Sequence, residues 1–143
     1  MKPTGIIILL LSGILLSACS VKPRPIQEGV DNCAFCKMTV MEKQYAAEIV
    51  TNTGKVFVFD DAKCMKIFIR ENTIPREEME LILISDFNDP EQLLPADKAI
   101  LFTSDKLRTP MNGKTVALSD SNALKALQES MEGTSSSVHE WLQ

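Results

Sequence analysis

Apolar and polar positions alternate in short runs along most of the chain, and their spacing predicts the secondary structure. Residues 45–51 and 55–59 are two β-rich runs. Between them lies Asn52-Thr53-Gly54, a turn signal of the kind that joins antiparallel strands. A β-hairpin is therefore expected near the start of the folded body.

A helix is predicted directly after this hairpin. Residues 62–70 carry apolar side chains at helical spacing, and the acidic residues Asp60 and Asp61 precede them. Acidic side chains suit the N-terminal end of a helix, where they accept hydrogen bonds and complement the dipole. An apolar strand is expected over residues 81–85.

The second half of the chain repeats this order more faintly. Residues 99–103 and 115–118 are strand candidates, and Asp120 precedes a helical pattern over residues 121–131. The following tail, residues 134–137, is polar, and we expect it to be mobile. The order of these elements predicts an α+β domain built from two related units that pack as one compact body.

The N-terminus has the pattern of an export signal. Lys2 is followed by an apolar run over residues 6–16, which is shorter than the roughly 20 residues that span a bilayer. Leu16-Ser17-Ala18-Cys19 resembles the lipobox of bacterial lipoproteins, which are cleaved before the cysteine and acylated on it. An ordinary signal peptide and an uncleaved anchor helix are the alternatives.

These features divide the chain into three parts. Residues 1–18 are expected to be a lipoprotein signal peptide, and residues 19–31, which contain Pro23 and Pro25, a lipidated tether. Residues 32–143 form the predicted folded domain. This arrangement predicts an extracytoplasmic protein that the lipid on Cys19 attaches to the inner or the outer membrane of a bacterium.

Charge and composition exclude several functions. The formal net charge of −4 becomes −5 without the signal peptide, and phosphate binding needs a basic surface, so nucleic-acid binding is not expected. The sequence offers no phosphate loop, Ser/His/Asp set or paired-carboxylate site for hydrolysis. A binding protein, not an enzyme, is predicted.

Sulfur-containing residues carry the most informative chemistry. Cys33, Cys36 and Met38 lie within six residues, Cys64 follows in the predicted helix, and Met111 lies in a late loop. Thiolates and thioethers are soft ligands that favour copper(I) over magnesium, calcium or manganese. Structural zinc requires four Cys or His ligands, and the spacing here does not match a zinc finger or ribbon.

The chain resembles the NosL family, lipoproteins accessory to nitrous oxide reductase. The matching features are Cys19, the Cys33-x-x-Cys36-x-Met38 segment, the stretch from Phe59 to Met65, and the Pro110-Met111 loop. The resemblance implies a pair of small ββα-type units. It also implies a protein that delivers copper(I) outside the cytoplasm, with nitrous oxide reductase or its maturation machinery as client. By matching positions, it implies Cys36 and Met38 as central ligands, Met111 as a further thioether and Cys33 as a helper.

The pattern departs from the family at two positions that carry glycine in many members. Lys37 stands between the second cysteine and Met38, and Asn112 stands directly after Met111. A third departure is Leu94-Pro95, where the family often has tryptophan.

Structural roles compete with metal binding at several of these residues. Cys33 and Cys36 can form a disulfide in an oxidising compartment. Cys64 lies at an apolar position of the predicted helix, and buried cysteine is commonly a core residue. The acidic pair before it, Asp60 and Asp61, suits helix capping. His139, the single histidine, lies in a terminal segment and is not expected to be a ligand.

The main alternative function is a membrane-tethered thiol-disulfide oxidoreductase that uses Cys33 and Cys36. Redox Cys-x-x-Cys motifs normally begin a helix, which lowers the pKa of the first thiol. Residues 37–40 are instead β-prone, which favours the copper(I) interpretation. A structural lipoprotein with incidental cysteines is a third possibility.

Overall fold

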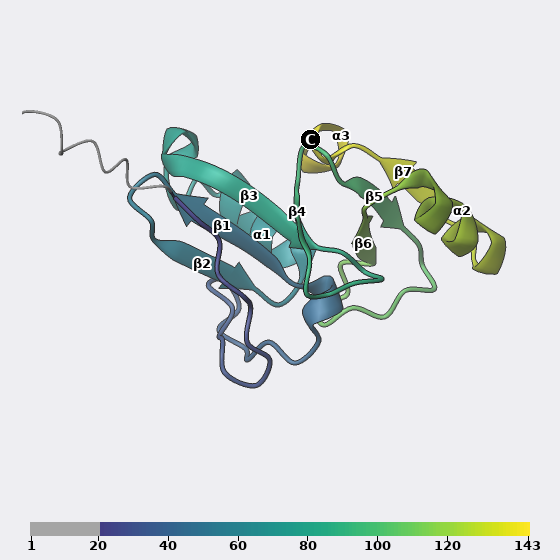
Figure 1. The fold of residues 1–143 in the computed structure, drawn as a ribbon, viewed down its shortest axis with the longest axis horizontal. Helices are drawn as coiled ribbons and strands as arrows, with labels where there is room; N and C mark the ends of the chain where they lie inside the picture. The colour runs from purple at the N-terminus through teal and green to yellow at the C-terminus, as the bar shows by residue number, and fades with distance from the viewer. Residues whose placement is uncertain (1–20) are drawn as a thin grey trace, which may run out of the picture.

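The computed structural model describes residues 21–143, and Figure 1 shows their arrangement as two adjoining α+β units. The predicted signal peptide and Cys19 lie outside the described residues. Within the described part of the chain, no helix has the length and apolar character needed to cross a membrane.

The first unit is built on a four-stranded antiparallel sheet. Its strands are β1 (Ala47–Thr51), β2 (Val56–Phe59), β3 (Met79–Ser85) and β4 (Leu93–Pro95), in the order β2-β1-β3-β4. The hairpin of β1 and β2 and the apolar strand β3 agree with the prediction. Two short 3-10 helices, η2 (Lys43–Tyr45) and η3 (Arg76–Glu78), precede β1 and β3.

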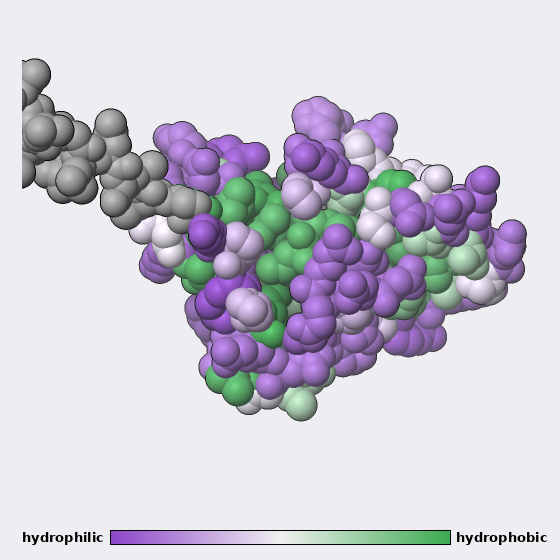
Figure 2. Space-filling view, in the orientation of Figure 1, coloured by the Kyte–Doolittle hydropathy of each residue, from purple (hydrophilic) through white to green (hydrophobic). Residues whose placement is uncertain are grey.

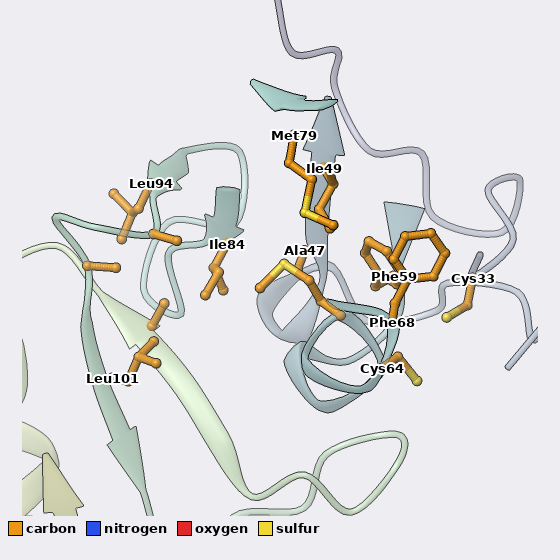
Figure 3. Packing of buried hydrophobic residues seen from close by; sticks show 14 residues of the cluster. Cys33, Ala47, Ile49, Phe59, Cys64, Phe68, Met79, Ile84, Leu94 and Leu101 are labelled. Atoms are coloured by element: carbon orange, nitrogen blue, oxygen red, sulfur yellow. The ribbon is translucent and has the colours of Figure 1, made fainter. Parts of the chain in front are cut away.

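The helix predicted from the apolar spacing is present as α1 (Ala62–Arg70), which packs against β1 and β2 (Figure 1). Asp61 is its N-cap and accepts a hydrogen bond from the main-chain N–H of Lys63 at 2.8 Å. The ring of Phe68 lies 5.1 Å from that of Phe59, so the helix packs tightly on the end of β2. Figure 3 shows these side chains in the core beside Cys33 and Cys64.

The second unit holds a three-stranded sheet, β5 (Ile100–Thr103), β6 (Thr115–Leu118) and β7 (Thr134–Ser136), in the order β6-β5-β7. Helix α2 (Ser121–Ser130) starts at its predicted cap, Asp120, whose side chain accepts hydrogen bonds from two main-chain N–H groups. The expectation of a mobile tail was wrong, because residues of that tail pair with β5 as strand β7.

Both units share one hydrophobic core. Apolar residues of the two sheets, including Ile84 and Leu101, belong to the same buried cluster. Phe87 donates its main-chain N–H to the carbonyl of Ala117 at 2.9 Å, which ties the two sheets together. The terminal helix α3 (Val138–Leu142) packs Trp141 against this core. The predicted α+β body of two ββα-type units is confirmed.

Residues 24–31 of the expected tether are folded onto the body. Arg24 forms an ion pair with Asp31 at 2.7 Å, and Gly29 donates its main-chain N–H to the carbonyl of Val40. Ile26 is only 4% exposed and packs in a small cluster on the sheet face opposite α1, together with Val40, Ala46 and Val58. The packed body therefore begins near Arg24, several residues before the predicted boundary at 32.

Polar residues cover most of the surface seen in Figure 2, and apolar residues appear mainly over the first sheet. Among the described residues, the exposed large apolar side chains all lie between positions 30 and 41: Val30, Met38 and Met41. This segment also carries Cys33 and Cys36, so its apolar exposure coincides with the sulfur-rich part of the sequence.

Candidate metal centre

Three thiols and one carboxylate converge at one end of the first unit. One ligand atom from each of Cys33, Cys36, Asp60 and Cys64 lies within 4.8 Å of the other three. We call these four residues the thiol cluster. They come from two segments, the loop before β1 and the junction between β2 and α1, and among residues 21–143 the three cysteines are free thiols.

The first segment is a turn held by main-chain hydrogen bonds. Lys37 donates its N–H to the carbonyl of Cys33, and Cys33 donates its own N–H to the carbonyl of Met38 at 2.8 Å. Ala34 donates its N–H to the carbonyl of Val58 at 2.7 Å, which fixes the turn on β2. Cys33 and Cys36 therefore reach the end of β2 together.

Lys37 adopts the left-handed backbone conformation, with φ of 68°. Asn112, the other position where the family often has glycine, has φ of 53°. Glycine reaches this region without a Cβ clash, and asparagine tolerates it better than most residues. Both departures thus keep a backbone shape that glycine would adopt more easily.

The second segment brings Asp60 and Cys64 to the same place. Asp60 lies just after the end of β2, and Cys64 lies in the first turn of α1, where its N–H bonds to the carbonyl of Asp61 at 2.9 Å. Oδ1 of Asp60 lies 3.4 Å from the Sγ of Cys36, which donates to it. Its Oδ2 is buried and has no hydrogen-bond partner, so one acceptor of the cluster is unused.

Burial differs among the thiols. Cys33 and Cys64 are buried, as is Asp60, whereas Cys36 is half-buried. The cluster is therefore reached from outside through Cys36.

The environment gives the three thiols different acidities. The pKa of Cys33 is lowered to about 6, chiefly because the Cys64 thiol donates a hydrogen bond to it. The same bond raises the pKa of Cys64, since its proton is held there, and burial adds to the effect. Burial is also the main cause that raises the pKa of Cys36 to about 11. Of the three thiols, Cys33 is therefore the one whose surroundings favour the thiolate.

The two methionines expected from the family resemblance lie outside the thiol cluster as defined. Met38 follows Cys36 by two residues, and its side chain is 53% exposed. Met111 is half-buried and packs against the same hydrophobic core as Cys36. The main-chain N–H of Met111 donates to Oδ2 of Asp61 at 2.9 Å, so its loop is attached to the start of α1.

Asp60 and Cys64 are the members of the cluster that we did not select as ligands from the sequence. Cys64 lies in the core, as expected, but its thiol also meets those of Cys33 and Cys36. Asp60 and Cys64 lie on either side of Asp61, the N-cap of α1, and this shared position at the start of the helix was the available signal. The capping role expected of the acidic pair belongs to Asp61 alone.

The fold and the thiol cluster define a small α+β protein with a preformed, sulfur-rich group able to hold a metal ion. Residues 25–141 match the sequence model of the NosL family, and the chain therefore belongs to the NosL family.

A solved structure supports the same fold. The crystal structure of the copper chaperone NosL from Shewanella denitrificans is similar, with a TM-score of 0.68 and 15% sequence identity over 82% of this chain and 92% of that chain. A comparison with curated protein sequences gives no match.

Proposed function

We propose that this protein is an extracytoplasmic copper(I) chaperone that binds the ion through sulfur and delivers it to a copper enzyme. The observation that carries the proposal is the convergence of three thiols from two separate segments within 4.8 Å. Membership of the NosL family and the similarity to a copper chaperone of that family support it.

Ligand chemistry favours copper(I). Thiolates and thioethers are soft ligands, and copper(I) accepts low coordination numbers, so sulfur alone can hold it, whereas zinc would also need the Asp60 carboxylate as a fourth ligand. In the proposal, Cys36 and Met38 are the central ligands, with Met111 as a further thioether and Cys33 as a helper thiol. Cys64 lies close enough to the other thiols to take part.

Release of the ion is expected to begin at Met38. This side chain is 53% exposed and lies two residues from the half-buried Cys36, while Cys33 and Cys64 are enclosed. A neutral thioether dissociates without taking up a proton, so an incoming ligand from a partner can replace it directly. The site can thereby retain the ion and still surrender it by ligand exchange.

The distribution of acidity argues against a thiol-disulfide oxidoreductase. Such an enzyme needs an accessible thiolate. Here the low pKa, about 6, belongs to Cys33, which is 1% exposed, while the accessible Cys36 has its pKa raised to about 11. The turn ends at Cys36 and no helix begins directly after it, so the helix that lowers a redox thiol's pKa is missing from residues 37–40.

The delivery target and the location belong to the same proposal. The lipobox-like sequence ending at Cys19 supports attachment to a bacterial membrane on its outer side. The family resemblance makes nitrous oxide reductase, or the machinery that assembles its copper sites, the expected client. The protein then acts as a binding and delivery partner and not as an enzyme.

Anaerobic competition with a copper(I) chelator tests the proposal. The reduced protein should bind one copper(I) per monomer in preference to zinc. Cys36→Ser and Met38→Leu should each weaken binding by at least about tenfold, or about 1.4 kcal/mol. Met41→Leu is the matched control, because Met41 is also exposed, at 66%, and lies in the same segment. Wild-type affinity in both Cys36→Ser and Met38→Leu would reject the site.

An insulin-reduction assay separates the alternative function. We expect no turnover above that of the Cys36→Ser variant. Clear turnover by the wild-type protein would instead favour the oxidoreductase.

A further inference from the structure

Asp61 is a fully buried carboxylate that touches both parts of the proposed copper site. Its main-chain carbonyl accepts the N–H of Cys64, and its side-chain Oδ2 accepts the N–H of Met111, both at 2.9 Å. Asp61 thus joins Cys64 to Met111, which lies 47 positions further along the sequence.

The carboxylate is the centre of a larger set of hydrogen bonds. Oδ1 accepts the N–H of Lys63 at 2.8 Å and so caps α1. Besides Met111, Oδ2 accepts from the Thr109 hydroxyl at 2.6 Å and from the N–H of Gly113 at 3.3 Å. A helix cap alone would need only the first bond, so the remaining three serve the loop.

The loop fits closely around this carboxylate. The Thr109 hydroxyl also accepts the N–H groups of Gly113 and Lys114, at 2.8 and 3.1 Å. A Cβ atom on Gly113 would lie 2.3 Å from Oδ1 of Asp61 and 2.7 Å from the Cβ of Lys63. The loop can approach α1 this closely only because residue 113 has no side chain.

We propose that Asp61 is a positioning residue for copper(I) binding, which holds Met111 in place relative to the thiol cluster. The inference rests on the proposed function and assigns to Asp61 a task that neither helix capping nor metal ligation describes. Buried groups that orient ligands typically change metal affinity by about 10–100-fold when they are replaced.

The test compares copper(I) affinity by anaerobic chelator competition in Asp61→Asn, Met111→Leu and the double variant. Asp61→Asn keeps the shape of the side chain but puts an amide where three N–H or O–H donors need an acceptor. We expect about tenfold weaker binding for each single variant. If Asp61 acts through Met111, the double variant should bind no more weakly than Met111→Leu alone.

Asp120→Asn is the matched control. Asp120 caps α2 through the same kind of bonds, and its side chain accepts from the N–H groups of Asn122 and Ala123 in its own helix. This variant should lose helix stability but keep copper(I) affinity. Copper X-ray absorption gives a second readout, in which Asp61→Asn should lose one sulfur neighbour, as Met111→Leu does, and keep its thiolate ligands.

If Asp61→Asn fails to fold, Thr109→Val is used instead. This variant removes the hydrogen bond between the loop and Asp61 from the loop side and leaves the cap of α1 intact. Ser104→Ala is its control, because Ser104 is another buried hydroxyl that bonds elsewhere, to the carbonyl of Glu132. Wild-type affinity in Asp61→Asn or Thr109→Val, or additive losses in the double variant, would overturn the inference. Failure of the wild-type protein to bind copper(I) would instead overturn the proposed function.

Discussion

The Sγ of Cys36 lies 3.4 Å from Oδ1 of Asp60, so a half-buried sulfur is joined to a buried carboxylate. Oxygen ligands suit zinc and other harder ions better than they suit copper(I). The carboxylate therefore adds little to a copper(I) site but can complete a four-ligand site for zinc with the three thiols.

Asp60→Asn should accordingly change the choice of metal. We expect zinc affinity to fall by at least about tenfold and copper(I) affinity to change by less than about threefold. Chelator competition with each ion measures both. Asp86→Asn is the control, since Asp86 is also a buried carboxylate and bonds to the main-chain N–H of Asn88, outside the cluster. Equal losses for the two ions would contradict the prediction.

Glu48 should make stability depend on pH. This strand residue is fully buried, its Oε2 has no partner, and burial raises the pKa of its carboxyl above the ordinary 4.5. The folded state therefore holds the proton more tightly than the unfolded state. The contribution of protonated Glu48 to the free energy of unfolding is fully present below pH 4.5. It is lost as pH rises through the pKa of Glu48 in the folded state.

Glu48→Gln removes this titration. Its melting temperature should exceed that of the wild-type protein at pH 7, and the difference should shrink at pH 4. Glu80→Gln, at an exposed position of β3, should show no such dependence. A difference between Glu48→Gln and wild type that is the same at both pH values would speak against a buried charge.

The backbone at Lys37 predicts a stabilising substitution. With φ of 68°, Lys37→Gly should relieve an unfavourable conformation, and part of that gain is offset because glycine is more flexible in the unfolded chain. We expect the free energy of unfolding to rise by about 0.5 kcal/mol. Urea denaturation measures it. Lys125→Gly, in the exposed surface of α2, should instead cost about 1 kcal/mol, and a similar loss in Lys37→Gly would refute the argument.

The N-terminal segment should contribute to stability through Ile26. Because this side chain is 4% exposed, Ile26→Ala should cost about 2–5 kcal/mol. Val30→Ala removes methyl groups from a side chain that is 63% exposed, and it should change stability by less than about 0.5 kcal/mol. Thermal or urea unfolding compares the two. Similar small effects would indicate that the segment is a loose tether.

The spacing of apolar residues predicted those helices and strands that have a clear signal in their own local sequence. The hairpin, α1 and α2 each combine a clear apolar pattern with a turn or cap, and all three are present. Strand β7 is polar and exists only because β5 offers an edge to pair with. Helix α3 has a sequence signal, because Ser137 and Glu140 form a capping box. Its five residues, however, are too few to show a helical pattern of apolar positions.

The candidate site likewise has one part that the local sequence predicts and another that only the tertiary structure brings into place. Cys33 and Cys36 meet because they share one turn, which their spacing indicates directly. Cys64 reaches them only because the turn docks on β2, through the bond from Ala34 to Val58, and α1 begins where β2 ends. The local sequence gives no signal for this tertiary contact. A core role was therefore predicted for Cys64, because cysteine is commonly buried in helices.

The thiol cluster connects a loop to a helix, and this has a consequence for the lifetime of the protein. An ion that contacts both Cys36 and Cys64 would hold these elements together and bind the folded chain more tightly than the unfolded chain. The loop would then open less often to proteases. We therefore expect the metal-free protein to be degraded faster than the metal-bound protein.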